Sequence, residues 1–346
     1  MKKITKYGLS ALCGSLAVMS GASAGEMKVV GNAHLTWTSV KGVTGQPLGM
    51  KTNLSFVGNG ELDGGQTFSV TVAHTDQNAW SSSNITLNTN NLGTFKLSMA
   101  EGGAGIGGYD DNMPRAFEER WDAGVGTSIN LQKGVGSSTN LSWVIPRIWA
   151  TTLQVAWAPE NDGTQPNDKS VGGASSNFLM NTGYDAVLRI NPSFGAFGAD
   201  LFVGGSTTEQ EENQSNQQNR TGNHEEAVAG LILDIGPISI GGQGSAESTK
   251  ASTQGEVEYY GNTSFGAALN INDNLSISYG EGRAIKSFVN ASDDVSNIMM
   301  RGESVQVAYT LGGVALKYAD TEWENANYTR NGGTTDGKVL SLSMAF

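Results

Sequence analysis

Charged side chains are concentrated in one stretch of the chain, between positions 100 and 124 (AEGGAGIGGYDDNMPRAFEERWDAG). Two carboxyl groups held close together could act as acid and base in glycoside hydrolysis, but nothing in the spacing fixes two of them at a productive separation. On a loop that faces water, the same charges would instead act on passing ions through their electric field. The second half of the stretch contains five acidic and two basic residues: Asp110, Asp111, Glu118, Glu119, Asp122, Arg115 and Arg120.

Two further patterns that could carry chemistry are incomplete. Residues 103–108 (GAGIGG) match the GxGxxG pattern of dinucleotide-binding proteins, but no βαβ unit or acidic partner on a second strand accompanies them. The histidines, His34, His74 and His224, are too scattered in the sequence to suggest a metal site. We therefore predict no catalytic residue, no metal site and no cofactor.

The composition of the chain indicates a large, exported protein rich in β-strands. Glycine accounts for 47 of 346 residues, about twice the usual share, and there are only 7 prolines. The net charge of −12 argues against a nucleic-acid partner. No run of about 18 apolar residues follows position 24, so no transmembrane helix is expected. Aromatic and β-branched residues are spread along the chain, which argues against disorder.

The first 24 residues are organised like a secretory signal peptide. Three lysines precede an apolar run that ends near position 19, and Ala-Ser-Ala follows at 22–24 as a cleavage site. We expect residues 1–24 to be removed, which leaves residues 25–346 as the mature chain. An uncleaved membrane anchor is the alternative, although the apolar run is short for a spanning helix. The single cysteine, Cys13, lies in this segment, so we expect no disulfide in the mature chain.

Alternation of apolar and polar residues with a period of two recurs after position 24 and predicts β-strands. In one example, Phe197, Leu201 and Val203 share a face opposite Asp200. We count sixteen such segments, at about 20 residues for each strand with its connection. Short connections, such as 236–237 and 312–313, alternate with long polar ones, such as 205–223 and 325–335.

Short turns at one end and long loops at the other are typical of outer-membrane barrels. The apolar faces of such strands can contact lipid, and closure of the sheet leaves no backbone edge unpaired. We therefore predict an all-β fold, a transmembrane 16-stranded antiparallel β-barrel that forms one domain over residues 25–346. A soluble sandwich, in which two sheets bury these faces against each other, is the alternative.

The end of the chain supports this fold class. Residues 337–346 (GKVLSLSMAF) alternate strictly and end on Phe346. They resemble the terminal signature by which outer-membrane barrels are recognised for assembly. The barrel-assembly machinery is therefore an expected partner, through Phe346 and its strand.

Over residues 25–346 the chain resembles the trimeric general porins of Gram-negative bacteria, which have sixteen strands. The most specific part is 110–122 (DDNMPRAFEERWD), which resembles the acidic third loop that these porins fold into the barrel. Residues 140–146 (NLSWVIP) resemble the strand that leaves that loop. The chain departs from the family pattern in having Arg115 and Arg120 inside the acidic loop, and in polar insertions such as 209–220.

This resemblance implies a homotrimer in the lipid of the bacterial outer membrane that passes small hydrophilic solutes and ions by diffusion. The third loop, at about 100–124, would fold inward and narrow the channel. Two other functions remain open. One is a substrate-selective outer-membrane channel, and the other is a barrel that serves as an adhesin or an outer-membrane enzyme.

A barrel of sixteen strands encloses more volume than its inward side chains fill, so water would occupy the lumen. Carboxylates on the loop and cations on the wall would set up a field across it. The acidic balance favours a mild preference for cations. Alternatively, the acids pair with Arg115 and Arg120, and the wall cations lie at rims or turns. From the alternation along each strand, the basic residues expected on the inward face are Lys51, Lys96, Arg189 and Lys317, with Arg147 at a turn.

Overall fold

The computed structural model describes residues 27–40, 45–62, 64–75, 82–99, 101–121, 125–136, 138–161, 180–210, 219–290 and 297–345. The expected signal peptide at 1–24, Asp122 of the charged stretch and Phe346 lie outside the described residues.

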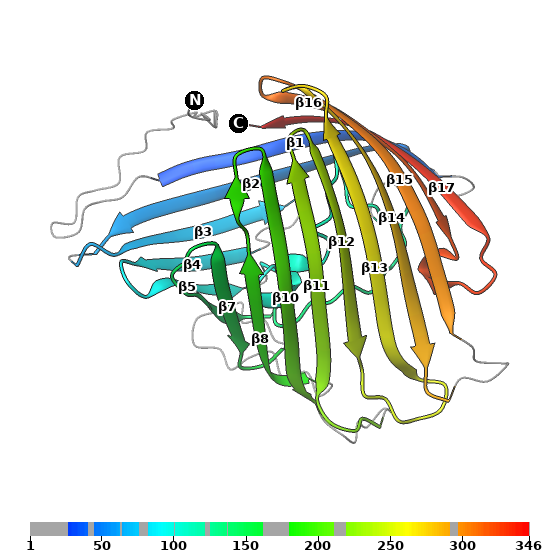
Figure 1. Ribbon diagram of the computed structural model, residues 1–346, viewed down its shortest axis with the longest axis horizontal. Helices are drawn as coiled ribbons and strands as arrows, with labels where there is room; N and C mark the ends of the chain where they lie inside the picture. The colour runs from blue at the N-terminus through cyan, green and yellow to red at the C-terminus, as the bar shows by residue number, and fades with distance from the viewer. Residues whose placement is uncertain are drawn as a thin grey trace.

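The described strands form one antiparallel sheet that closes on itself, because β1 pairs with β2 on one side and with β17 on the other (Figure 1). The sheet has 17 strands, of which β9 has only 2 residues and pairs beside β8 on β10, so the wall is a 16-stranded barrel. The strands are β1 (Met27–Val40), β2 (Leu48–Glu61), β3 (Thr67–Thr75), β4 (Ser82–Thr89), β5 (Gly93–Met99), β6 (Asn140–Val144), β7 (Thr151–Ala158), β8 (Met180–Ile190), β9 (Ser193–Phe194), β10 (Phe197–Gln210), β11 (His224–Ile235), β12 (Ile238–Ser248), β13 (Val257–Asn270), β14 (Leu275–Phe288), β15 (Ile298–Leu311), β16 (Val314–Glu324) and β17 (Thr334–Ala345).

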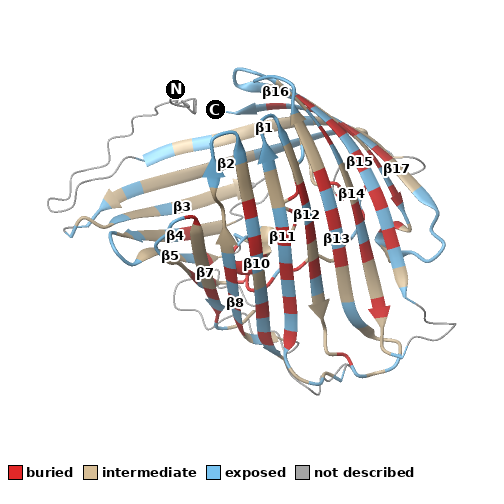
Figure 2. Ribbon diagram, viewed as in Figure 1, coloured by how far each residue is buried: buried red, intermediate tan, exposed pale blue. Residues whose placement is uncertain are grey.

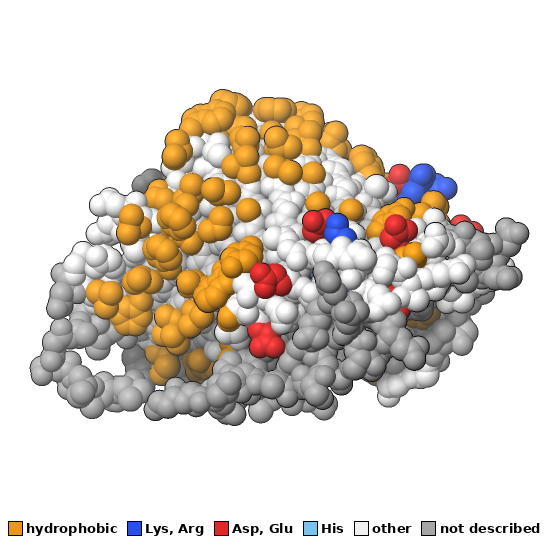
Figure 3. Space-filling view, turned by 90° about the horizontal axis from the view of Figure 1, so that it is seen from below, with side chains coloured by type: hydrophobic (Ala, Val, Ile, Leu, Met, Phe, Trp, Pro, Cys, Tyr) orange, Lys and Arg blue, Asp and Glu red, His pale blue; other side chains and the backbone are white. Residues whose placement is uncertain are grey.

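The two faces of each strand differ in the way that the alternation predicts. On β15, Val305 and Val307 are exposed, while Ser304 and Gln306, which alternate with them, are buried. Figure 2 shows the same alternation of exposed and buried positions along β15. Hydrophobic side chains gather over much of the described outer surface on the side of the molecule that Figure 3 shows. Side chains alternate between the two faces of a strand, so the small and polar residues point to the inside of the barrel. The predicted all-β barrel is confirmed.

Short and long connections alternate around the barrel, as the sequence predicts. Gly236, with a φ of 60°, lies in the two-residue turn between β11 and β12, and Gly312, with a φ of 61°, lies in the turn between β15 and β16. Positive φ values are readily adopted only by glycine, which explains its presence in these turns. One predicted boundary is wrong. The loop expected from position 205 begins after Gln210, because the pairing of β10 with β11 continues to Thr208.

Two short 3₁₀ helices occur in the described residues, η1 (Gly105–Tyr109) and η2 (Ala326–Tyr328). No helix in this described part of the chain is long and apolar enough to cross a membrane. Buried apolar side chains gather where the segment between β5 and β6 meets the wall. Two examples are Ile106 with Phe202 and Trp121 with Trp323.

Candidate functional site

The connection between β5 and β6 contains the charged stretch and is the third long connection of the barrel. We divide it into an outgoing leg, residues 101–121, and a return leg, residues 125–136. Gln243, Ser278 and Gln306 are buried on the inner faces of β12, β14 and β15. Three backbone N–H groups of the outgoing leg donate hydrogen bonds to them: Asn112 to Gln243 Oε1 at 3.1 Å, Ala116 to Ser278 Oγ at 2.9 Å and Phe117 to Gln306 Oε1 at 2.9 Å. The outgoing leg therefore lies against the inner face of the wall.

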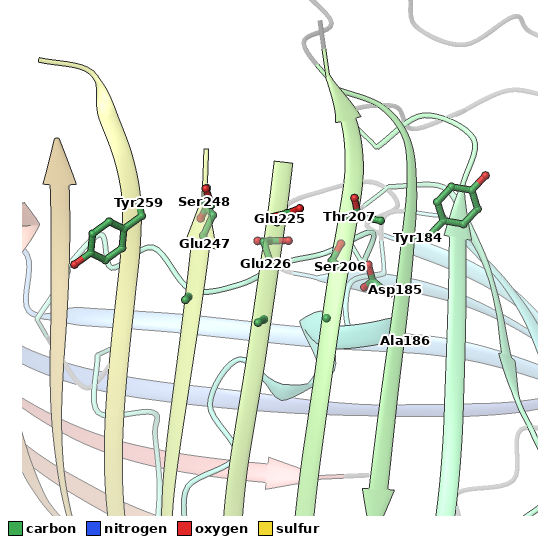
Figure 4. A pocket seen from close by; sticks show the side chains of 13 residues that line it. Tyr184, Asp185, Ala186, Ser206, Thr207, Glu225, Glu226, Glu247, Ser248 and Tyr259 are labelled. Carbon is green, nitrogen blue, oxygen red and sulfur yellow. The ribbon is translucent and has the colours of Figure 1, made fainter. Parts of the chain in front are cut away.

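Two buried carboxylates hold the start of the outgoing leg and the end of the return leg against the wall. Asp185 on β8 and Glu226 on β11 both lie opposite Ser206 of β10, and they are 3% and 7% exposed (Figure 4). Asp185 accepts hydrogen bonds from the backbone N–H groups of Ile106, at 3.1 Å, and Val135, at 3.2 Å. Hydrogen bonds to a charged acceptor are stronger than neutral ones. Asp185 thus connects the two legs to each other and to the wall.

Glu226 holds the return leg in the same way. Its carboxylate accepts hydrogen bonds from the backbone N–H groups of Lys133, at 2.9 Å, and Gly134, at 2.6 Å. The sequence analysis assigned no role to Asp185 or Glu226. The signal that could have identified them is an acidic residue at an inward position in the middle or at the start of a strand, where carboxylates are rarely buried without partners.

The far end of the outgoing leg is held by aromatic packing. The rings of Trp121 and Trp323 lie 5.9 Å apart between centroids, and Trp323 Nε1 donates a hydrogen bond to the carbonyl oxygen of Arg120 at 3.0 Å. Val125 and Met300 are buried in the same cluster. Packed aromatic pairs contribute stability beyond the area they bury, so this end of the segment is fixed to β15 and β16.

The return leg also contacts η2 in the connection between β16 and β17. The backbone N–H of Asn327 donates to the carbonyl oxygen of Thr127 at 2.9 Å, and the backbone N–H of Asn130 donates to the phenol oxygen of Tyr328 at 3.2 Å. Burial raises the pKa of Tyr328 to about 12, so its hydroxyl stays neutral at physiological pH. The last long connection is therefore joined to the segment inside the barrel.

Asp111 and Arg120 of the charged stretch form a buried ion pair. Arg120 Nη2 lies 2.6 Å from Asp111 Oδ1, and the two side chains are 4% and 1% exposed, respectively. Burial raises the pKa of Asp111 and lowers the pKa of Arg120, while their mutual attraction opposes both shifts. A buried pair contributes little net stability, but removing one partner is costly. These two residues join distant parts of the outgoing leg and are shielded from water.

The other charges of the stretch are more accessible. Arg115 Nη2 lies 3.3 Å from Glu119 Oε1, and both side chains are about one-third exposed. Asp110 and Glu118 are half-buried, and the backbone carbonyl of Glu118 accepts a hydrogen bond from Gln306 Nε2 at 2.7 Å. The acids and arginines of this stretch are therefore partly paired with each other, and Asp122 lies outside the described residues.

The five basic residues that the sequence predicts on the inner wall lie in different surroundings. Lys96 is on the inner face of β5 and pairs with Glu101 at 2.8 Å, and Arg189 on β8 pairs with Asp200. Arg147 lies in the connection between β6 and β7, where its guanidinium donates to the backbone carbonyl oxygens of Trp149 and Asn191. Arg147 therefore stabilises a turn at the end of the barrel with the short connections.

Lys51 and Lys317 lie on inner faces close to the first and last strands. Lys51 on β2 is exposed and stands directly opposite His34 of β1. Lys317 Nζ on β16 lies 5.3 Å from the ring centroid of Phe117, within the range of a cation–π interaction with the outgoing leg. Among the described residues neither lysine has an acidic partner. No group of side chains in the same described ranges is suited to hold a metal ion.

Solved structures with the same architecture include porins. OmpF from Salmonella typhi, in a complex with daunomycin, superposes with a TM-score of 0.67 at 12% identity, over 93% of this chain and 98% of that one. An OmpT from Vibrio cholerae with loop L8 deleted gives a TM-score of 0.61 at 10% identity, over 94% and 100%. An anion-selective porin from Comamonas acidovorans gives 0.59 at 12% identity, over 93% and 99%. The chain has the porin fold.

At these identities the likeness is one of fold. No protein-family model matches the sequence, and neither does any curated relative. The outgoing leg covers only part of the inner wall of this barrel. Gln243 and Gln306 are 7% and 2% exposed beneath the outgoing leg, whereas Lys51 is exposed and His34 is partly exposed on β2 and β1.

Proposed function

We propose that this chain is an outer-membrane porin, a water-filled channel for the passive diffusion of small hydrophilic solutes and ions. The observation that carries the proposal is a segment of the chain hydrogen-bonded to the inner face of a closed barrel, at Gln243, Ser278 and Gln306. A barrel of sixteen strands leaves an aqueous lumen. The segment between β5 and β6 takes up part of that lumen and narrows it.

The proposed selectivity filter has two sides. Asp110, Glu118 and Glu119, the last paired with Arg115, give the loop a net negative charge, and Lys51 and Lys317 provide positive charge on the wall. A field between them would orient dipolar solutes and bias ions. Asp111 and Arg120 neutralise each other and contribute little to it. The acidic balance of the chain, −12, favours a mild preference for cations, which the two lysines oppose.

We further propose that the protein is exported with cleavage of residues 1–24, inserted by the barrel-assembly machinery through the strand that ends in Phe346, and assembled as a homotrimer. A solved OmpT of Vibrio cholerae is described as a trimer form. The outward faces of the strands, with residues such as Val305 and Leu342, would contact membrane lipid or the neighbouring subunits.

Recordings of single channels from the purified full chain in a planar lipid bilayer test this function. We expect stepwise conductance that scales with the conductivity of the salt solution, with steps grouped in threes. The zero-current potential in a salt gradient gives the sign of the selectivity, and a clear preference for anions contradicts the proposed sign.

The alternatives give different recordings. Saturable block of the current by one solute would indicate a substrate-selective channel. A correctly folded protein that gives no conductance would overturn the porin proposal and favour a barrel adhesin or an outer-membrane enzyme.

A further inference from the structure

Three glycines lie side by side on the inner wall, on three neighbouring strands. In the register of the sheet, Gly241 of β12 is opposite Gly266 of β13, and Gly266 is opposite Gly280 of β14. We call these three residues the glycine row. Neighbouring strands are about 4.8 Å apart, so the row is a band about 10 Å wide without side chains.

The backbone at these positions does not require glycine. The residues with positive φ in the described part of the chain do not include Gly241, Gly266 or Gly280, so a side chain would fit their conformation. Glycine inside a strand lowers its stability relative to alanine. A strand glycine that the conformation does not need often marks the close approach of another backbone.

The outgoing leg makes that close approach. A Cβ added at Gly266 would lie 2.7 Å from the carbonyl oxygen of Pro114 and 2.9 Å from Cβ of Met113. At Gly241 it would lie 3.1 Å from Cδ of Pro114, and Cγ1 of Ile232 on the neighbouring strand would be 3.0 Å away. Distances below 3.0 Å require something to move, and at Gly266 the obstacle includes backbone.

The same strand has glycine on its outer face without such neighbours. A Cβ added at Gly242, next to Gly241 but on the opposite face, would have its nearest neighbour at 3.8 Å, the carbonyl oxygen of Ser264. At Gly244 the nearest atom would be 3.7 Å away. Both distances are ordinary contacts, so the tight fit is a property of the face that meets the outgoing leg.

We propose that the glycine row is a recess in the inner wall that holds the outgoing leg and thereby sets the width of the channel. The inference rests on the proposed porin function. Gly241, Gly266 and Gly280 are positioning residues. Gly241 and Gly266 let Met113 and Pro114 lie at the depth that side chains occupy elsewhere on the wall, and Gly280 does the same for the side chain of Arg120, whose Nη1 and Cδ would lie 3.5 and 3.7 Å from an added Cβ. This leaves more of the lumen to water.

A side chain in the row would push the segment toward the centre of the barrel. Carbon atoms in contact prefer a separation of about 3.5–4.0 Å, so a methyl group at Gly266 must displace Cβ of Met113, at 2.9 Å, by about 1 Å. A larger side chain displaces it further. The hydrogen bonds at Asp185 and the packing at Trp323 keep both ends of the leg on the wall. The middle of the leg must therefore bulge inward.

The experiment compares single-channel conductance of Gly266→Ala and Gly266→Val with that of Gly242→Ala and Gly242→Val, in the full chain. We expect a loss of conductance at position 266 that is larger for valine than for alanine, and unchanged conductance at position 242. Heat resistance of the folded barrel is measured for all four variants, because a purely structural effect would lower it without a graded change in conductance. Unchanged or larger conductance in folded Gly266 variants overturns the proposal.

Two further measurements keep the test decisive. If Gly266→Val does not fold, the comparison of Gly266→Ala with Gly242→Ala decides, because all three nearest neighbours of a Cβ at Gly266 belong to the leg. If the parent protein does not conduct, the porin proposal fails, and spin labels at Glu119→Cys and Lys51→Cys measure the distance across the lumen instead. A shorter distance in the Gly266 variant than in the Gly242 variant supports the recess, and an equal distance overturns it.

Discussion

The inner face of the barrel differs between β12–β14 and β1–β2, although both regions are built on the same alternation. On β12–β14 the inward residues next to the outgoing leg include glycine, serine and glutamine, and Gly241, Gln243, Gly266 and Ser278 are buried beneath it. On β1 and β2 they are larger. His34 and Asn53 there contact Asn32 Oδ1, at 3.0 and 3.2 Å, and remain partly exposed.

This difference indicates that the type of residue on the inner wall depends on what the wall contacts at that place. Where the chain's own backbone lies on the wall, small residues and side chains that accept backbone hydrogen bonds are favoured. Where water lies on the wall, long polar and charged residues such as Lys51 can extend into it. The wall is therefore divided into a part that binds the loop and a part that lines the proposed channel.

The largest effect is expected from removing the two carboxylates that bind the loop, in Asp185→Ala combined with Glu226→Ala. Each hydrogen bond to a charged group contributes about 1.5–3 kcal/mol. The start of the outgoing leg and the end of the return leg would both lose their hydrogen bonds to the wall. We expect a larger and noisier single-channel current. Glu225→Ala is the matched control, because Glu225 is adjacent to Glu226 but lies on the outer face and pairs with Lys250. A double variant with the current of the control would show that the carboxylates do not hold the loop.

The second effect concerns the buried pair in the loop. Arg120→Met leaves Asp111 charged and buried, which destabilises by about 3–5 kcal/mol. Combining it with Asp111→Leu removes both charges and should restore most of the lost stability. Denaturant unfolding followed by tryptophan fluorescence measures both variants, and the buried Trp121 beside Arg120 reports on the loop. Equal stability of the single and double variants would contradict a role for the pair in holding the leg together.

The smallest effect is expected on the side that lines the channel. Lys317→Gln removes one positive charge from the inner wall next to Phe117 without disturbing a hydrogen bond to the loop. The zero-current potential in a salt gradient should shift slightly toward cation preference. Lys338→Gln, on the outer face of β17 beside Asp320, should leave it unchanged. A shift of the same size in both variants would mean that the effect is not specific to the lumen.

The fold was predictable because its signal is local. Alternation within a strand such as β15 and the turn residues at Gly236 and Gly312 are visible within a few positions of sequence. Closure of the sheet then follows, because an open edge in lipid would leave backbone groups unpaired. Strand ends were less certain, and β10 extends beyond its predicted end because pairing with β11 continues.

The path of the loop was not predictable, since its contacts join positions far apart in the chain. Ala116 and Ser278 are 162 residues apart, and Phe117 and Gln306 are 189 apart. The sequence showed five acids and two arginines, but not that Asp111 is buried against Arg120. It also showed an excess of glycine, but not that Gly241 and Gly266 meet the loop.

The contact between η2 and the return leg joins the exterior to the interior mechanically. Asn327 and Tyr328 are reached from the end of the barrel with the long connections, and their hydrogen-bonded partners, Thr127 and Asn130, belong to the segment within. A molecule that binds and displaces η2 from outside would therefore act on the return leg through these two hydrogen bonds, without entering the barrel.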